Sequence, residues 1–219
     1  MVWVKICGIT STNEALKIAD LEPDALGFIL STDSRRRISL VQAESIITQV
    51  RKRYGSRSPS MVGVFVNEPV SYIYQAIENL ALDMVQLSGN EDIDYIKDVN
   101  KTGAAVIKAI ACKLQTDVQG IIADIEQVAD YFLADTYSKN SYGGSGKTFD
   151  WEIVSGLNMK EKLIIAGGLG PDNVTEAINT VDPFGVDAST GLELPGGGKD
   201  KEKVKKFITL ARGMGGHYG

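Results

Sequence analysis

The sequence predicts a single-domain α/β protein, a (β/α)8 barrel with parallel strands. Eight short apolar runs recur along the 219 residues, stretches with helical spacing lie between them, and no linker, low-complexity segment or charge-block tail divides the chain. A chain of this length buries one substantial core but is short for two ordinary α/β domains. A doubly wound open sheet has the same alternation, but eight repeats favour one closed barrel over residues 1–219.

The predicted strands are short runs rich in apolar and β-branched residues. Several are almost continuously apolar, which is the pattern expected when both faces of a parallel strand are covered. In chain order these runs are residues 2–9, 25–30, 61–66, 84–87, 105–110, 131–134, 162–166 and 184–188.

The predicted helices lie between these runs, with Ser39 and Asp172 as N-cap residues of the second and the fifth in the list below. Residues 199–206 alternate lysine with acidic and apolar positions, so they are interpreted as the solvated face of the last helix. The glycine-rich end, residues 213–219, is expected to fray. Helical spacing covers residues 12–19, 40–53, 70–80, 117–129, 173–179 and 199–211.

Composition restricts the partners and the compartment. The formal net charge is −5 and the isoelectric point is near 5.0, which gives no long-range attraction for nucleic acid or for an anionic membrane surface. Two cysteines, Cys7 and Cys112, have no metal-ligand spacing around them. The start of the chain lacks a secretion signal, and no apolar run approaches the roughly 20 residues that span a bilayer. We therefore expect a cytoplasmic protein.

Candidate chemistry lies at the C-terminal ends of the predicted strands, where barrels of this type carry their active sites. Cys7 ends the first run beside Gly8, at a position that the sequence presents as an exposed rim, where a thiol of lowered pKa is a base or nucleophile. Asp135 follows the sixth run, where partial burial raises the pKa of a carboxyl group toward the general-acid range. The competing interpretations are a small buried hydrophobe for Cys7 and a helix cap or loop ion pair for Asp135.

Small-residue loops late in the chain are typical of a phosphate site. Residues 143–151 are glycine-rich but lack the four-residue spacer of a Walker motif, which argues against a nucleoside triphosphate. Two further loops follow the seventh and eighth runs, and their backbone N–H groups can converge on an anion. The predicted phosphate-binding residues are Gly144, Ser145, Gly146, Gly167, Gly168, Ser189 and Thr190.

The densest basic cluster is residues 35–37, after the second run, where an arginine can clamp a carboxylate through two hydrogen bonds. Its competing interpretation is a solvated charge run. Cys112 and His217 are assigned no chemistry, the first as a packed thiol and the second as a tail residue.

Six segments resemble, in order and at their separations, the signature motifs of the phosphoribosylanthranilate isomerase family. The resemblance spans nearly the whole chain, and the combination of the first, fourth and fifth segments is specific. The segments are KICGI (5–9), VGVFVN (62–67), VQLSG (85–89), GGSGKTFDW (143–151), AGGLGPDNV (166–174) and VDASTGLE (186–193).

The resemblance implies an Amadori rearrangement of a phosphorylated aminosugar in tryptophan biosynthesis. Cys7 is implied as general base, Asp135 as general acid, Arg36 as the clamp for the anthranilate carboxylate, and the late loops as the phosphate site. The substrate nitrogen supplies its own electron sink, so no metal, flavin or pyridoxal cofactor is implied. The oligomeric state stays open between monomer and homodimer.

Two positions depart from the family pattern. Arg35 stands between Ser34 and Arg36 where the family usually has proline, so which guanidinium meets the carboxylate stays open. Ser88 stands where the family usually has histidine, which removes a possible titrating neighbour from the site.

Two alternative functions follow from other features. An isomerase of the related histidine-pathway aminosugar shares the fold but characteristically uses two aspartates, and the first strand here ends in Cys7. A phosphate-ligand binding or scaffold protein needs neither a base nor an acid, so Cys7 and Asp135 together argue against it.

Overall fold

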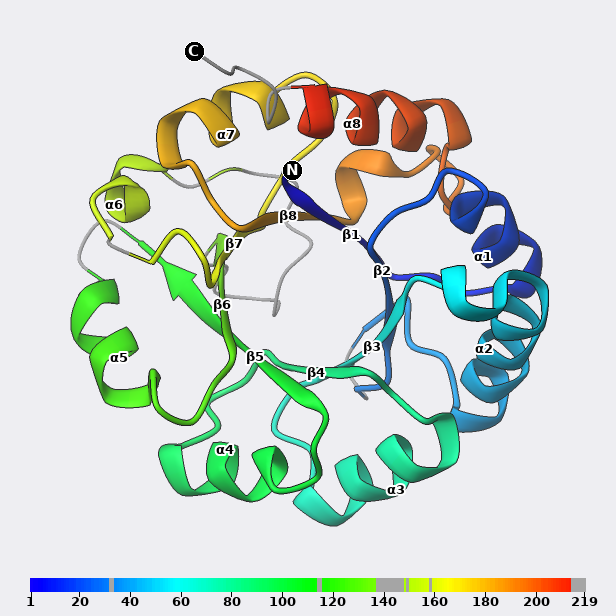
Figure 1. The fold of residues 1–219 in the computed structure, drawn as a ribbon, viewed down its shortest axis with the longest axis horizontal. Coiled ribbons are helices and arrows are strands. Elements are labelled where there is room, and N and C mark those ends of the chain that lie inside the picture. Colours follow the sequence, from blue (N-terminus) through cyan, green and yellow to red (C-terminus); the bar gives the residue numbers. More distant parts are fainter. Residues whose placement is uncertain (32–33, 114–115, 137–147, 149, 158, 214–219) are drawn as a thin grey trace.

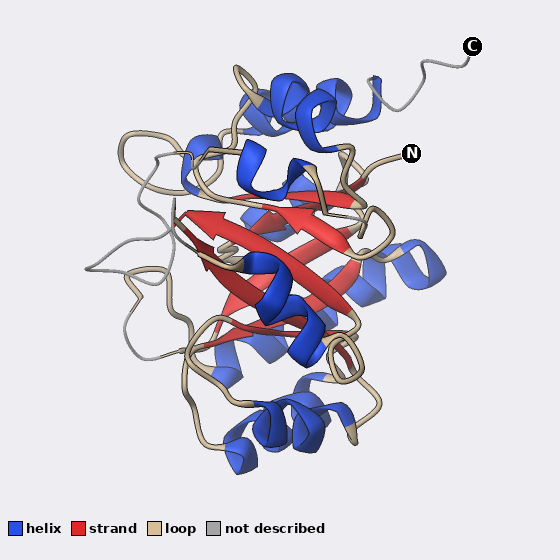
Figure 2. Cartoon of the chain, turned by 90° about the vertical axis from the view of Figure 1, so that its left-hand side faces the viewer, coloured by secondary structure: helices blue, strands red, loops and turns tan. Residues whose placement is uncertain are grey.

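The chain folds into a closed barrel of parallel strands surrounded by helices, as Figure 1 shows along the barrel axis and Figure 2 from the side. The structure is a computed structural model that describes residues 1–31, 34–113, 116–136, 148, 150–157 and 159–213. The eight strands follow one another in sequence order, and β1 pairs with β8 to close the barrel. The predicted single-domain (β/α)8 barrel is therefore confirmed.

In the described part of the chain, eight strands and eight α-helices alternate. The strands are β1 (Trp3–Cys7), β2 (Ala25–Ile29), β3 (Ser60–Phe65), β4 (Met84–Leu87), β5 (Ala105–Cys112), β6 (Tyr131–Thr136), β7 (Leu163–Ile165) and β8 (Gly185–Ala188). The α-helices are α1 (Thr12–Ala19), α2 (Leu40–Tyr54), α3 (Val70–Leu80), α4 (Ile93–Asn100), α5 (Val118–Ile125), α6 (Glu152–Ser155), α7 (Val174–Val181) and α8 (Lys201–Gly213). Short 3-10 helices η1 (Gly55–Arg57) and η2 (Thr190–Leu192) complete the list.

Of the two predicted N-cap residues, Ser39 is confirmed and Asp172 is wrong. Ser39 caps α2 through a capping box in which its hydroxyl accepts from the Gln42 N–H and the Gln42 side chain accepts from the Ser39 N–H. The Asp172 prediction is wrong, because α7 begins one residue later and Asn173 is its N-cap residue. The Asn173 side chain binds the preceding loop instead, accepting from the Gly170 N–H at 2.8 Å.

The core has two parts, as the almost continuous apolar runs predicted. Strand residues that point outward pack against the helices, and those that point inward fill the barrel. At the N-terminal end of the barrel the Phe184 ring stacks on Trp3 and lies 4.9 Å, centroid to centroid, from Tyr131. The buried hydrophobic cluster inside the barrel consists of Ala25, Val62, Met84, Ile107, Leu133, Ile164 and Ala166.

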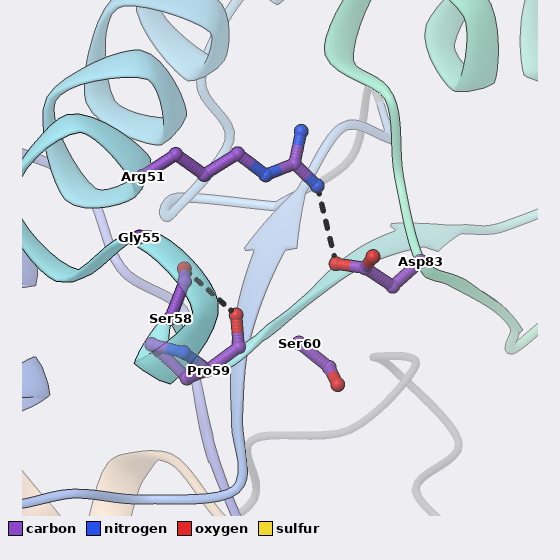
Figure 3. Close-up of a pocket in the computed structure, with 6 residues that line it drawn as sticks. All are labelled: Arg51, Gly55, Ser58, Pro59, Ser60 and Asp83. Atoms are coloured by element: carbon purple, nitrogen blue, oxygen red, sulfur yellow. Dashed lines mark hydrogen bonds and ion pairs between the residues drawn. The ribbon is translucent and has the colours of Figure 1, made fainter.

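A hollow of about 370 Å³ lies at the N-terminal end of β3, bordered by Ser60 and by Asp83 just before β4. Figure 3 shows the Arg51 guanidinium pointing across it to Asp83, with an N–O distance of 3.2 Å. Barrels of this type carry chemistry at the other end of the strands, so we assign these contacts to stability. In the part of the chain that the structure describes, no helix has the length and apolar character needed to cross a membrane.

Candidate active site

Cys7 is the last residue of β1 and points into the barrel at the C-terminal end of the strands. Gly27 on the paired strand makes room for it, because a Cβ atom on Gly27 would lie 2.8 Å from the Cys7 Sγ atom. The expectation of an exposed rim position is wrong, since Cys7 is only 6% exposed. The neighbouring strand therefore accommodates the thiol, and a ligand must enter the barrel mouth to reach it.

Charged groups surround the Cys7 thiol and affect its pKa in opposite directions. Burial raises this pKa above its ordinary value, and the carboxylate of Asp187 acts in the same direction. The cations of Lys5, Lys199 and Arg36 lower it but do not cancel the effect of burial. These neighbours together favour the thiol form, and any positive charge that a ligand develops nearby favours the thiolate.

Asp135 belongs to β6, which extends to Thr136 beyond the predicted run. Burial raises the pKa of its carboxyl group to about 6, against the opposing hydrogen bond that the Thr136 N–H donates to Oδ1 at 2.7 Å. Gly167 lies against it, because a Cβ atom there would lie 2.9 Å from the same oxygen, and the φ of Gly167 is +82°. A carboxyl group with this pKa is partly protonated near neutral pH, as a general acid requires.

Arg36 is held at the same end of the barrel by residues that follow β8. Its Nε donates to Glu193 Oε1 at 2.7 Å and its Nη2 donates to Thr190 Oγ1. The Arg36 side chain is only 13% exposed, whereas that of Arg35 is 73% exposed. Arg36 is thus the arginine of the basic cluster that joins the site.

The two late loops lie against each other. After β7, the carbonyl of Leu169 and the backbone of Gly170 pack on Gly191, which follows β8. Gly167 and Gly168 are in the first loop, and the Ser189 hydroxyl in the second donates to the Cys7 carbonyl at 2.9 Å. The loop after β8 therefore contacts both the loop after β7 and Cys7. Gly144, Ser145 and Gly146 lie outside the described residues, as does His217.

Comparison with known protein families identifies the chain. Residues 4–210 match the family model described as N-(5'phosphoribosyl)anthranilate (PRA) isomerase. The chain belongs to the N-(5'-phosphoribosyl)anthranilate isomerase family. It is 40% identical, over 98% of its length and 100% of the relative's, to the isomerase of Thermoanaerobacter sp.. The predicted family, isomerase activity and place in tryptophan biosynthesis are thereby confirmed.

Solved isomerases have the same fold. The enzyme of Thermotoga maritima superposes with a TM-score of 0.85 at 35% identity, covering 97% of this chain and 100% of its own. A second isomerase structure, in complex with reduced 1-(o-carboxyphenylamino)-1-deoxyribulose 5-phosphate, superposes with a TM-score of 0.81 at 33% identity, covering 97% of this chain and 100% of its own.

A buried ion pair lies beneath these side chains in the isomerase barrel, and the sequence analysis missed it. The Lys5 Nζ donates to Asp187 Oδ2 at 2.7 Å and to Gln86 Oε1 at 2.8 Å, and the Lys5 side chain is fully buried. The second carboxylate oxygen of Asp187 is buried and has no hydrogen-bond partner among the residues that the structure describes. The sequence indicates this ion pair only through a lysine and an aspartate that lie inside otherwise apolar strand runs.

Lys199 is a second residue that the sequence analysis misplaced. It was assigned to the solvated face of the last helix, but α8 begins at Lys201 and the Lys199 side chain is fully buried. Its Nζ donates to the Ser189 carbonyl and to Glu193 Oε1, both at 3.1 Å. The charge alternation of residues 199–206 concealed this inward-pointing lysine.

Cys112 is a packed thiol, as predicted, and is 2% exposed at the end of β5. No cluster of histidine, cysteine and carboxylate side chains able to hold a metal ion occurs among the described residues of this isomerase.

Proposed function

We propose that the chain converts N-(5'-phosphoribosyl)anthranilate to 1-(2-carboxyphenylamino)-1-deoxyribulose 5-phosphate, with Cys7 as general base and Asp135 as general acid. The observation that carries this assignment is that a thiol and a carboxyl group of raised pKa face the same barrel mouth. Both are within electrostatic reach of Lys5 and Asp187. A base and an acid close enough to share charged neighbours suit a reaction with two proton transfers.

In the first step, Asp135 gives its proton to the furanose ring oxygen as the bond from this oxygen to C1′ breaks. The nitrogen lone pair forms the new C=N bond, so ring opening produces a cationic Schiff base. Because the pKa of Asp135 is raised to about 6, the proton is held more tightly than by an ordinary carboxyl group but is still available for transfer.

In the second step, the Cys7 thiolate takes the C2′ proton. The electron pair of the C2′–H bond forms a C=C bond, and the C=N electrons return to nitrogen, which gives the neutral enolamine. The iminium charge favours the thiolate that burial disfavours, so ring opening prepares the base. Tautomerisation then gives the ketone, and the substrate itself is the electron sink, so we propose that no cofactor is needed.

Two anionic groups of the substrate require binding partners. Arg36 is proposed to receive the anthranilate carboxylate through its guanidinium N–H groups. For the phosphate we propose the late loops, with Gly167, Gly168, Ser189 and Thr190 together with Gly144, Ser145 and Gly146. The packing of the loop after β7 on the loop after β8 supports a single anion site.

The first experiment is a fluorescence assay of purified protein with freshly made N-(5'-phosphoribosyl)anthranilate and no added cofactor. Cys7→Ala and Asp135→Asn are each expected to lose nearly all turnover while keeping the circular dichroism of the parent. Cys112→Ala, which removes the other buried thiol, is the matched control and is expected to stay active. Substantial turnover by Cys7→Ala or Asp135→Asn would refute the role assigned to that residue.

The related histidine-pathway aminosugar is the second substrate to assay. Barrels that isomerise it characteristically use two aspartates, and the thiol at the end of β1 therefore predicts turnover of the anthranilate compound alone. Equal rates on both substrates would identify a bifunctional isomerase.

We further propose that the chain acts as a monomer in the cytoplasm. The proposed base, acid and carboxylate-binding arginine come from β1, from β6 and from the loop after β2 of the same barrel, so the proposed chemistry does not require a residue from a second copy. Both cysteines are unpaired and buried, which suits a reducing compartment.

A further inference from the structure

Glu193, which follows η2, is an acidic side chain within the basic part of the site. On the basis of the function proposed above, we propose that Glu193 is a positioning residue that fixes the Arg36 guanidinium for the substrate carboxylate and so sets the preference for a carboxylated aromatic ring.

Glu193 and Arg36 are joined by a short, shielded ion pair. The Arg36 Nε lies 2.7 Å from Glu193 Oε1, and the two side chains are only 13% and 11% exposed. A charge-assisted hydrogen bond in such surroundings is stronger than its exposed counterpart. Because Glu193 occupies the Nε edge, the Nη groups are left to contact other partners.

The stem of Arg36 lies against backbone. A Cβ atom on Gly8 would lie 2.8 Å from the Arg36 Cδ atom, so the arginine stem lies directly on this glycine, whose φ of +83° favours glycine. Thr190 accepts from Nη2. With its stem on Gly8 and its head between Glu193 and Thr190, the guanidinium is held in one orientation, which reduces the entropy lost when a ligand binds.

The charge balance of the cluster still favours an anion. Glu193 contacts three cations, namely Arg36, Lys199 at 3.1 Å and the exposed Arg35 at 3.3 Å. Burial alone would raise the pKa of Glu193, but Lys199 and Arg36 outweigh it and hold this pKa below its usual range. One carboxylate among three cations leaves a positive excess, which a substrate carboxylate can neutralise.

Lys199 connects this clamp to the rest of the site. Its buried Nζ binds both Glu193 and the carbonyl and hydroxyl of Ser189, in the candidate phosphate loop. A Cβ atom on Gly8 would also lie 3.6 Å from this Nζ. The carboxylate clamp and the phosphate loop therefore share a single buried cation.

The opposite possibility is that Glu193 competes with the substrate for Arg36. The two cases predict opposite changes in the affinity for carboxylated ligands when Glu193 is replaced. A positioning residue strengthens binding of carboxylated ligands, so its loss weakens them; a competitor weakens binding, so its loss strengthens them.

The test measures Kd by calorimetry for two ligands, reduced 1-(o-carboxyphenylamino)-1-deoxyribulose 5-phosphate and its phenylamino counterpart without the carboxylate. We expect the parent chain to prefer the carboxylated ligand by roughly 10- to 100-fold, as suits charge-assisted pairing. Glu193→Gln is expected to lose most of this preference while binding the phenylamino ligand as the parent does, which also shows that the variant is folded.

Two further variants separate position from charge. Glu193→Asp keeps the charge but shortens the side chain by one methylene group, so it too is expected to lose the preference. Glu202→Gln, which makes the same charge change at an exposed position on α8, is expected to keep it. An unchanged preference in Glu193→Gln, or tighter binding of the carboxylated ligand, would overturn the proposal.

Turnover tests the proposed function separately. With N-(5'-phosphoribosyl)anthranilate, Glu193→Gln is expected to raise KM roughly 10-fold or more with little change in kcat, because it leaves Cys7 and Asp135 intact. Absence of turnover in the parent chain would refute the proposed function and not the role of Glu193, which the binding ratios measure. A loss confined to kcat would instead contradict the positioning role.

Discussion

At the scale of single residues, burial raises the pKa of both proposed catalytic groups. The raised pKa favours the protonated form that the acid needs and disfavours the ionised form that the base needs. Burial raises the pKa of Asp135 to about 6, which keeps a proton on the acid. It also raises the pKa of Cys7, which withholds the thiolate that the base must provide. Burial therefore stabilises protonated Asp135, whereas ionised Cys7 is stabilised only by nearby positive charge. That charge comes from Lys5, Lys199, Arg36 and the cationic substrate intermediate.

The pH dependence of kcat/KM follows from these two pKa values. The active form has Asp135 protonated and Cys7 ionised, and because the acid has the lower pKa this form is a minor, constant fraction between the two. We expect kcat/KM to rise about tenfold per unit up to about pH 6, stay level, and fall beyond the Cys7 pKa, above its ordinary 9.0.

Initial rates at limiting substrate, from about pH 5 to about pH 10, check this profile. An acidic limb at about pH 4, the ordinary carboxyl range, would show that the group controlling that limb is not a buried Asp135.

Lys5 is expected to hold the pKa of Cys7 below the value that burial alone would give. The two side chains point inward from alternate positions of β1, and the Lys5 ammonium lowers the Cys7 pKa. In Lys5→Met, the pH midpoint of Cys7 alkylation by iodoacetamide, followed by peptide mass spectrometry, is expected to rise by about one unit or more.

Lys17→Met, on the exposed face of α1, is the matched control and is expected to leave the midpoint unchanged. A midpoint in Lys5→Met equal to that of the parent would show that the buried ion pair with Asp187 serves packing alone.

The residues that sequence reasoning found and missed differ in one respect. Cys7 and Asp135 each follow or end an apolar run, so their place at the barrel mouth is visible from the pattern. Lys5 and Lys199 are charged side chains buried by pairing with Asp187 and Glu193, residues 182 and 6 positions away in sequence. Periodicity assigns a lone lysine to solvent, because it contains no information on such partners.

At the scale of elements, the starts of three strands use one device. Asp24, Asp83 and Asp130 stand immediately before β2, β4 and β6. Each donates its N–H to a carbonyl on the preceding strand, at Val4, Met61 or Val106, and its carboxylate accepts from the N–H of the same residue. This two-bond clamp recurs before β2, β4 and β6 but not before β8, which Phe184 precedes. Only one residue carries each copy, so the repeat is not visible in the sequence.

Removing one clamp is expected to lower stability without affecting turnover. Asp83→Ala leaves the Met61 N–H without its acceptor, 2.7 Å away, and should lower the free energy of unfolding by about 0.5–1.5 kcal/mol. Urea denaturation followed by circular dichroism measures this, and turnover per folded molecule should stay at the parent value because the site lies at the opposite end of the strands.

Asp94→Ala is the control for this change, because it removes an exposed ion pair with Lys97 and should cost close to nothing. Asp83→Asn, which retains an acceptor oxygen, is expected to recover part of the loss. If Asp83→Ala and Asp94→Ala have equal stability, the clamp contributes no net free energy.

Elements were predictable where burial is continuous. All eight strands overlap their predicted runs, since inward and outward faces are both apolar. Helices α4 and α6 are not among the predicted stretches. Helix α6 has only 4 residues, about one turn, which gives little periodicity to detect. Helix α4 has 8 residues, as many as the predicted α1 and α7, so its length does not explain its absence. Strand β1 ends at Cys7 and not at Ile9, since Gly8 turns the chain with φ of +83°.

At the scale of the whole molecule, closure of the barrel brings residues from both ends of the chain into one site. Pairing of β1 with β8 brings Cys7 next to Ser189, although 182 residues separate them, and the same closure brings Arg36 to Glu193 across 157 residues. A circular sheet places the start and the end of the chain side by side, so base, carboxylate clamp and candidate phosphate loop meet within one copy.

The proposed monomer depends on the outer surface of the barrel. Large exposed hydrophobic side chains in the described part of the chain are spread over different elements, for example Val41 on α2, Tyr74 on α3 and Ile121 on α5, whereas a stable dimer buries a contiguous apolar centre. We expect light scattering to give the 23.6 kDa mass of one chain, and turnover per chain to stay constant as protein is diluted from micromolar to nanomolar concentration. A twofold mass together with activity that falls on dilution would show that association completes the site, because a barrel that needs a partner loses function when the partner dissociates.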